Sequence, residues 1–148
     1  MALTDETADK DGSERASRGR VLVADADPRQ RRMTAIVLRL AGYQVSETGQ
    51  GLNVLMDGRR GAFDVVVLET RLLDGDGLDL IRALREQAET RTLPVLMYTA
   101  ERERQAEVEK VLGSEGFIAK PAGPSDLAER VAQLMRTGAR APDPQGAT

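Results

Sequence analysis

Five short apolar or β-branched runs recur along this chain, and segments with helical spacing separate them. The runs lie at residues 21–24, 43–46, 65–68, 95–98 and 117–119. Three of them are almost continuously apolar, which is typical of strands that are covered on both faces. The alternation predicts an α/β fold: a doubly wound, five-stranded parallel sheet with helices on both faces and right-handed crossovers.

Apolar residues between the runs recur at the spacing of a helix that packs one side against a core. The clearest sets are Met33, Ile36, Val37 and Leu40, then Leu80, Ile81 and Leu84, and last Leu127, Val131, Leu134 and Met135. Less regular patterns predict two further helices at residues 52–59 and 101–112. Asp27-Pro28 and Gly123-Pro124 indicate helix starts, and Gly42 and Gly113 indicate helix ends.

The 148-residue chain is long enough for one domain, expected at residues 20–136. Residues 1–19 and 137–148 are polar or rich in Ala, Pro and Gly, and we expect both to be disordered tails. No stretch approaches the roughly 20 apolar residues that cross a bilayer, and the N-terminus has no apolar segment typical of a secretion signal. A cytoplasmic location without membrane contact is therefore expected.

The chain has no cysteine and no histidine. These absences exclude disulfides, thiolate zinc sites, Ser-His-Asp triads, His-ligated metals and a phosphohistidine carrier role. The net charge is −3, and the only aromatic residues are two Phe and two Tyr, so few side chains are suited to stack on bases. We expect no enzyme activity and no direct partner among nucleic acids.

Ligands of a doubly wound sheet gather at the carboxyl ends of its strands. The residues that follow the predicted strands there are Asp25, Glu69, Thr99 and Lys120. This set resembles the receiver domain of two-component response regulators. The resemblance spans roughly residues 20–136 and is carried by VLVADADP, DVVVLE, GDG at 75–77, PVLMYTA and FIAKP. It implies a (βα)5 flavodoxin-like fold with strand order 2-1-3-4-5 and a role in phosphorelay signalling.

Receivers hold Mg²⁺ on two adjacent acidic residues and on the acceptor aspartate, and a Thr or Ser and a Lys contact the phosphoryl group. Asp25 matches the first acid, but Ala26 stands at the second position and Glu69 at the acceptor position. By the resemblance, Thr99 and Phe117 occupy switch positions and Lys120 is the pocket lysine. We expect no catalytic residue and weak or absent Mg²⁺ binding, for which Asp25 and Glu69 are weak candidates.

The longer side chain of Glu69 is expected to carry its carboxylate about 1.5 Å outward, toward Lys120 and Thr99. It would mimic a phosphorylated state only in part, because a phosphoryl group brings about −1.5 to −2 of charge. Arg71 is either a charge partner for Asp25 and Glu69, in place of a metal, or a solvated loop arginine.

Several residues have two possible roles. Asp27 is a replacement metal ligand or, more simply, a helix cap, and Asp25 is a metal ligand or a partner of Lys120. Phe117 is a switch residue or a core aromatic. The cluster Arg29, Arg31 and Arg32 is a docking surface for an acidic partner or a solvated helix face.

The leading hypothesis is an atypical, phosphorylation-independent receiver that binds a protein partner, or a second copy of itself, through the last helices and strand. The alternative is a receiver that retains Mg²⁺-dependent phosphoryl acceptance from a histidine kinase. A flavodoxin-like cofactor binder is a third hypothesis. Residues 24–28 argue against it, because they offer acids where a hydroxyl and glycine loop would cradle a phosphate.

Overall fold

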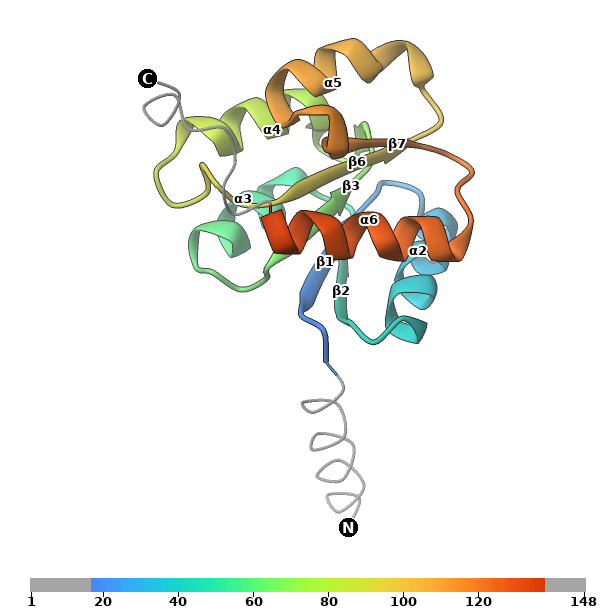
Figure 1. Cartoon of the computed structure of the whole chain (residues 1–148). Coiled ribbons are helices and arrows are strands. Elements are labelled where there is room, and N and C mark those ends of the chain that lie inside the picture. The colour runs from blue at the N-terminus through green and yellow to red at the C-terminus, as the bar shows by residue number, and fades with distance from the viewer. Residues whose placement is uncertain (1–16, 138–148) are drawn as a thin grey trace.

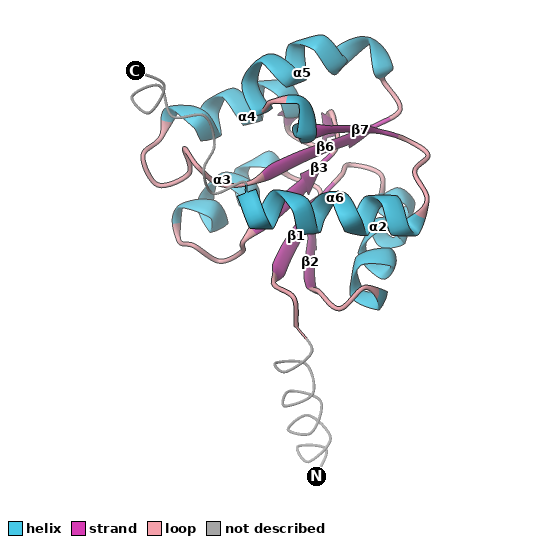
Figure 2. Ribbon diagram, in the orientation of Figure 1, coloured by secondary structure: helices cyan, strands magenta, loops and turns pink. Residues whose placement is uncertain are grey.

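The computed structural model of the protein describes residues 17–137, in which helices cover both faces of a five-stranded parallel sheet (Figures 1 and 2). The strands are β1 (Arg20–Ala24), β2 (Gln44–Thr48), β3 (Val65–Leu68), β6 (Val95–Thr99) and β7 (Phe117–Ala119). They lie in the order β2-β1-β3-β6-β7, which confirms the predicted order 2-1-3-4-5. Most of the two predicted tails lies outside the described residues.

Two helices cover one face of the sheet and three cover the other (Figure 1). The first pair is α2 (Pro28–Leu40) and α6 (Pro124–Thr137), and the second set is α3 (Gly51–Arg59), α4 (Gly77–Glu86) and α5 (Gln105–Leu112). No helix among residues 17–137 combines the length and the apolar character needed to span a bilayer.

The central strand β3 shows why the apolar runs are continuous. Its residues Val65 and Val67 belong to the core under α2 and α6, whereas Val66 and Leu68 belong to the core under α3, α4 and α5. Successive side chains of a strand point to opposite faces, so a strand covered on both sides needs an apolar residue at every position. All four residues of β3 are buried.

The predicted inner faces of α4 and α6 are confirmed, but the one predicted for α2 is wrong. Met33, Ile36 and Leu40 of α2 are exposed, and Val37 is only half-buried. The residues that α2 buries are Thr34, Ala35 and Leu38. Two of these side chains are small, and Leu38 is the one that joins the core under α2 and α6. The larger apolar residues lie on the outer side of the helix.

The predicted helix ends are largely as expected. Asp27 caps α2, because its Oδ1 accepts hydrogen bonds from the backbone N–H groups of Arg29 (2.9 Å) and Gln30 (3.4 Å). Gly42 and Gly113 follow α2 and α5 with positive φ angles of 104° and 88°, a conformation that favours glycine.

Some local elements were not foreseen. The loop after β3 forms a small antiparallel hairpin of β4 (Arg71–Leu72) and β5 (Gly75–Asp76). The helix expected at 101–112 begins as a 3-10 turn, η1 (Arg102–Arg104), and becomes α-helical only at Gln105. The second strand begins at Gln44, one residue later than predicted, because the Tyr43 amide still donates to the carbonyl of Leu38 in the turn after α2.

Candidate functional site

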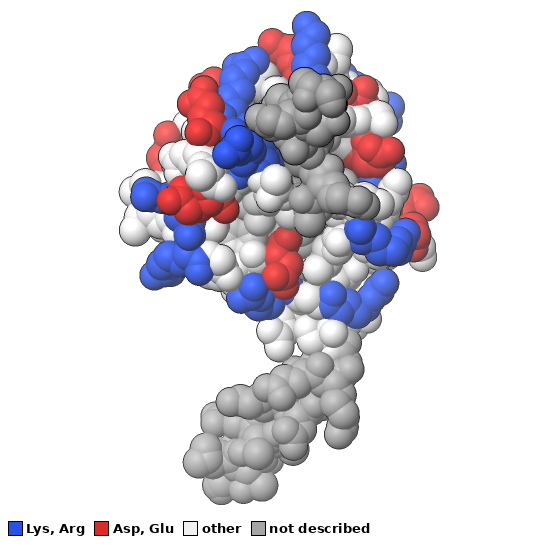
Figure 3. Space-filling model, turned by 60° about the vertical axis from the view of Figure 1, so that its left-hand side comes forward, with Lys and Arg blue, Asp and Glu red and all other residues white. Residues whose placement is uncertain are grey.

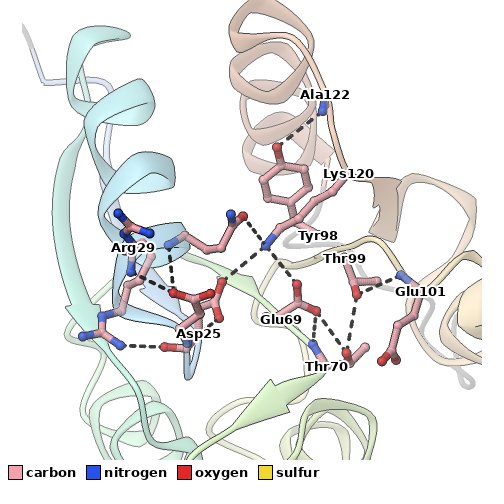
Figure 4. Close-up of polar contacts among 12 residues, drawn as sticks. Asp25, Arg29, Glu69, Thr70, Tyr98, Thr99, Glu101, Lys120 and Ala122 are labelled. Carbon is pink, nitrogen blue, oxygen red and sulfur yellow. Dashed lines mark hydrogen bonds and ion pairs between the residues drawn. The ribbon is translucent and has the colours of Figure 1, made fainter.

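The carboxyl ends of β1, β3, β6 and β7 surround a pocket of about 690 Å³. Figure 4 shows how its polar side chains converge from these strand ends. The pocket is lined by Asp25, Ala26, Asp27, Gln30, Glu69, Thr70, Arg71, Thr99, Ala100, Glu101, Lys120 and Pro121. Asp25, Glu69, Thr99 and Lys120, which the sequence placed at strand ends, therefore do meet in one cavity.

Lys120 lies at the centre of this group (Figure 4). Its Nζ is 2.9 Å from Oε2 of Glu69 and 3.3 Å from Oδ2 of Asp25, so one ammonium contacts both carboxylates. The same Nζ donates to the side-chain oxygen of Gln30 at 3.2 Å and lies 5.1 Å from the centre of the Tyr98 ring. The expected pairing of Lys120 with an acid is confirmed, and it involves both candidates.

Asp25 follows β1 and is almost fully buried, with 4% of its surface exposed. While Oδ2 faces Lys120, Oδ1 accepts the backbone N–H of Asp27 at 2.9 Å. The carboxylate of Asp27 accepts hydrogen bonds from backbone amides at the start of α2, which supports its interpretation as a helix cap.

Glu69 follows β3, and both of its carboxylate oxygens have partners. Oε2 contacts Lys120, while Oε1 accepts hydrogen bonds from the backbone N–H of Thr70 (2.6 Å) and from its hydroxyl (3.0 Å). The predicted reach toward Lys120 is therefore seen. On its other side the carboxylate contacts Thr70, and the Thr70 hydroxyl lies 3.4 Å from that of Thr99.

Thr99 is the last residue of β6 and is buried. Its hydroxyl oxygen accepts the backbone N–H of Glu101 at 3.2 Å. This hydrogen bond fixes the start of the loop that leads to α5. Thr99 is thus positioned between the pocket and that loop.

The pocket shifts the pKa values of Asp25, Glu69 and Lys120 in different directions. Burial raises the pKa of Asp25, although the Asp27 amide and Lys120 oppose this effect. Burial alone would also raise the pKa of Glu69, but the nearby Thr99 hydroxyl, Lys120 and the Thr70 amide outweigh it and lower that pKa. For Lys120, burial would lower the pKa, and the carboxylates of Glu69 and Asp25 reverse this and raise it. The Lys120–Glu69 pair is therefore held in its charged form.

The proposed role of Arg71 as a charge partner for Asp25 and Glu69 is wrong. Its side chain is 82% exposed, and its guanidinium lies 3.9 Å from the carboxylate of Glu101. Arg71 is the first residue of the β4–β5 hairpin, which directs its side chain toward solvent. The Arg71 backbone does stay at the pocket, since its carbonyl accepts the amide of Ala26 at 3.1 Å.

Two further predicted positions have limited roles in this geometry. Ala26 lines the pocket and supplies no side-chain oxygen. Phe117 begins β7 and is buried in the core under α3, α4 and α5, so the structure places it as a core aromatic, and its switch role stays a prediction. Among residues 17–137, no three acidic side chains are grouped as metal ligands would be.

Three side chains that contact Lys120 or Glu69 were not predicted from the sequence: Gln30, Thr70 and Tyr98. Gln30 lies on the first turn of α2, and only the start of that helix, signalled by Asp27-Pro28, could have placed it near the strand ends. Thr70 directly follows Glu69, and its hydroxyl at the end of a strand was an available signal. Nothing in the pattern distinguished Tyr98 from its apolar neighbours in β6.

Charge on the surface is mixed. Figure 3 shows Lys and Arg side chains interspersed with Asp and Glu over the face that it presents, without a broad area of one sign. Such a face lacks the continuous positively charged area expected of a nucleic-acid site.

Comparison with known proteins agrees with this architecture. The family model of the response regulator receiver domain matches residues 21–132. The chain is 32% identical over 118 residues to the chemotaxis protein CheY-3 of Vibrio cholerae, a match that covers 78% of the chain and 91% of CheY-3. It is 34% identical over 123 residues to the DNA-binding response regulator MtrA of Mycolicibacterium smegmatis, which covers 80% of the chain and 51% of MtrA. The chain thus spans about half the length of this second relative.

The fold is also similar to that of a solved structure, the chemotaxis response regulator CheY4 of Vibrio cholerae. The TM-score is 0.68 at 28% sequence identity, and the match covers 78% of the chain and 97% of the CheY4 chain. The match to the family model includes all five strands of the sheet, since it runs from β1 into α6.

Proposed function

Because this chain belongs to the response regulator receiver family of two-component signalling, we propose that it is an atypical member that signals by contact with another protein and accepts no phosphoryl group. One observation carries this proposal: the Lys120 ammonium lies against both Glu69 and Asp25. The charges that a metal would neutralise in the pocket are already paired within the protein.

The donor set of the pocket does not fit Mg²⁺. This ion requires oxygen ligands in near-octahedral geometry and is normally held by one or two carboxylates together with waters. Here the oxygens of Asp25 accept hydrogen bonds from Lys120 and the Asp27 amide, and those of Glu69 contact Lys120 and Thr70. Ala26 adds no oxygen. A cation would have to displace the Lys120 ammonium, so we propose that Mg²⁺ binds weakly or not at all.

The same contacts oppose phosphoryl acceptance. The attacking oxygen must be free to approach phosphorus in line, and the developing charge must be neutralised by a metal or a cation. Both oxygens of Glu69 are engaged, and Lys120 already neutralises the resting carboxylate. We therefore propose no catalytic role for any residue of the pocket.

The Lys120–Glu69 pair supports a fixed signalling state. In place of a reversible phosphoryl group, a permanent carboxylate contacts the pocket lysine, with one negative charge against about −1.5 to −2 for a phosphoryl group. The mimicry is partial. Partner binding through the last helices and strand, a homodimer through the same helices and a cytoplasmic location all stay predictions of the sequence.

An NMR titration tests the proposal. Amide shifts of the whole chain are recorded while Mg²⁺ and beryllofluoride are added. We expect no saturable shift at Asp25, Glu69 or Thr99. The control is the double variant Ala26→Asp/Glu69→Asp, which restores both acids and should show saturable shifts at these positions. Strong saturable shifts in the unmodified chain would instead favour a receiver that retains phosphotransfer.

A further inference from the structure

The last turn of α4 holds an arginine that pairs with no carboxylate among residues 17–137. The side chain of Arg85 is half-buried, and its one hydrogen bond to a described residue runs from Nη1 to the backbone carbonyl of Thr90 at 3.2 Å. Its Nε is shielded from solvent and has no acceptor there. Burial lowers the pKa of Arg85 to about 10. A cation in such a place is costly unless an anion is supplied to it.

A second unsatisfied group lies in the turn that follows α4. The Oε1 atom of Gln87 is also shielded from solvent, and no described residue donates to it. Thr90 closes this turn, because its amide donates to the carbonyl of Gln87 at 3.1 Å and its hydroxyl to that of Leu84 at 2.6 Å. Solvent reaches neither the Arg85 Nε nor the Gln87 Oε1, so their partners have to come from protein.

The two groups define the chemistry of the partner. A guanidinium binds a carboxylate through two parallel hydrogen bonds, and its Nε can donate one of them. The oxygen of Gln87 accepts an N–H group, which a peptide backbone supplies at every residue except proline. A free anion brings an acceptor for Arg85 but no donor for Gln87. The end of α4 therefore fits a peptide segment that carries Asp or Glu.

The end of α6 lies near this site. The helices α4 and α6 cover opposite faces of the sheet (Figure 1), and both run back toward the edge where the strands begin. Met135 of α6 and Asp64 lie together beside the residue that precedes β1. Phe63, next to Asp64, lies with Thr90 near the end of α3. Two consecutive residues before β3 thus connect the surroundings of the two helix ends.

The segment that follows α6 has a suitable acid at a suitable distance. Residues 138–148 contain one acidic residue, Asp143, between Pro142 and Pro144. Asp143 comes six residues after Thr137, and six residues span up to about 20 Å, more than the width of a helix at about 10–12 Å. The two prolines favour an extended backbone, which lowers the entropy lost on docking.

The segment before β1 contains more acids but is directed elsewhere. The amide of Arg18 donates to the carbonyl of Gly42 at 2.9 Å, and its guanidinium lies 5.1 Å from the centre of the Tyr43 ring. Gly42 and Tyr43 lie between α2 and β2, and β2 pairs with β1 on the side opposite β3. The described chain therefore approaches β1 from the side away from Arg85.

We infer that residues 138–148 dock at the end of α4, with the carboxylate of Asp143 on the guanidinium of Arg85 and a neighbouring backbone N–H on Oε1 of Gln87. Docking satisfies two groups that residues 17–137 leave without partners. It also fixes the path of the chain beyond α6, at the edge of the sheet opposite the pocket. The inference is independent of the proposed function, because Arg85 does not line the pocket.

The absence of cysteine allows a test by paramagnetic NMR. A nitroxide on the single cysteine of Gly146→Cys broadens the amide signals that lie near it in the full chain. We expect broadening at residues 85–90. Adding Asp143→Asn should lower the ratio of docked to free segment by about tenfold or more, because a charged hydrogen bond is lost. Asp126→Asn is the control, since Asp126 is an exposed acid of α6, and it should leave the broadening unchanged.

Arg85 gives a second, direct readout. Its Nε–H signal should be protected from exchange in the unmodified chain, and Asp143→Asn should shift it and remove the protection. Arg85→Lys keeps the positive charge but lacks the Nε donor and the planar fork, so it should also reduce the broadening from the nitroxide. The Asp143→Asn result stands by itself if Arg85→Lys does not fold.

Four outcomes would overturn the inference. The first is the absence of broadening at residues 85–90, and the second is equal broadening with and without Asp143→Asn. The third is the same broadening from a nitroxide on Leu3→Cys, which would make the N-terminal segment the occupant. The fourth is equal broadening when the nitroxide and the isotope label are on different molecules, which would place the segment of a second copy at Arg85.

Discussion

The Nζ atom of Lys120 lies 2.9 Å from Oε2 of Glu69, and this pair joins the ends of β7 and β3 across the pocket. The side chains of both residues are mostly shielded from solvent, at 12% and 15% exposure. A charged pair in such a place is screened less by salt than a surface pair. It therefore affects both the stability of the fold and the chemistry of the site.

Replacement of Glu69 by Gln tests the stabilising effect of the pair. The neutral amide keeps the size of the side chain but loses the ionic contact, and Lys120 keeps Asp25 as a partner. We expect the free energy of unfolding at pH 7 to fall by about 1.5 kcal/mol. Urea unfolding of both proteins measures this difference, and equal stabilities would show that the pair contributes nothing.

The same comparison has a definite pH dependence. The pKa of Glu69 is lowered in the folded protein from its ordinary value of 4.5. Its carboxylate therefore stabilises the fold fully above about that pH, and this stabilisation is lost as the pH falls through the lowered pKa of the folded state. The difference in unfolding free energy between the unmodified chain and Glu69→Gln should thus shrink below pH 4.5. A difference that grows on acidification would contradict the assignment.

Lys120→Met should convert the pocket into a cation site. Without the ammonium, Asp25 and Glu69 face each other unpaired, which we expect to cost on the order of 3 kcal/mol of unfolding free energy. Mg²⁺ at ten times its dissociation constant should restore about 1.4 kcal/mol. Thermal unfolding with and without Mg²⁺ measures the rescue.

Lys110→Met is the control, since Lys110 is an exposed lysine of α5 with no ion pair among the described residues. Rescue of the control or of the unmodified chain to the same extent would disprove the competition between Lys120 and Mg²⁺.

Gly77→Ala tests the close approach of Gly77 to the backbone of Glu69. A Cβ atom at Gly77 would collide with the backbone carbonyl oxygen of Glu69, and the Gly77 amide donates to the carbonyl of Thr70 at 2.7 Å. We expect a loss of about 1–3 kcal/mol in unfolding free energy. Gly123→Ala is the control, because only one flexible side-chain oxygen, from Asp126, lies near its Cβ position. A similar loss in both variants would mean that the approach at Gly77 is not the cause.

The fold was predictable because its dominant signal is local. The VVVL run of β3 and the helical spacing around Ile81 and Leu127 each identify their element without knowledge of the rest. The buried face of α2 could not be predicted in this way. Periodicity finds the apolar side of a helix, but here α2 buries the small residues Thr34 and Ala35 together with Leu38 and leaves larger apolar residues exposed.

The site was predictable to the extent that strand ends define it. Asp25, Glu69 and Lys120 follow strands and meet as expected. Arg71 was misplaced because its side chain direction is set by the β4–β5 hairpin, an element of two-residue strands with no sequence period of its own. Gln30 was missed for a related reason, because it reaches the pocket from a helix start and not from a strand end.

The most direct test of the account is phosphoryl labelling by acetyl phosphate in the presence of Mg²⁺, read by intact mass spectrometry. Three proteins are compared: the unmodified chain, Glu69→Asp and Ala26→Asp/Glu69→Asp. The first two should remain unlabelled, because Ala26 still withholds a metal ligand in the single variant, and the double variant should gain one phosphoryl group. Efficient labelling of the unmodified chain on Glu69 would contradict the account.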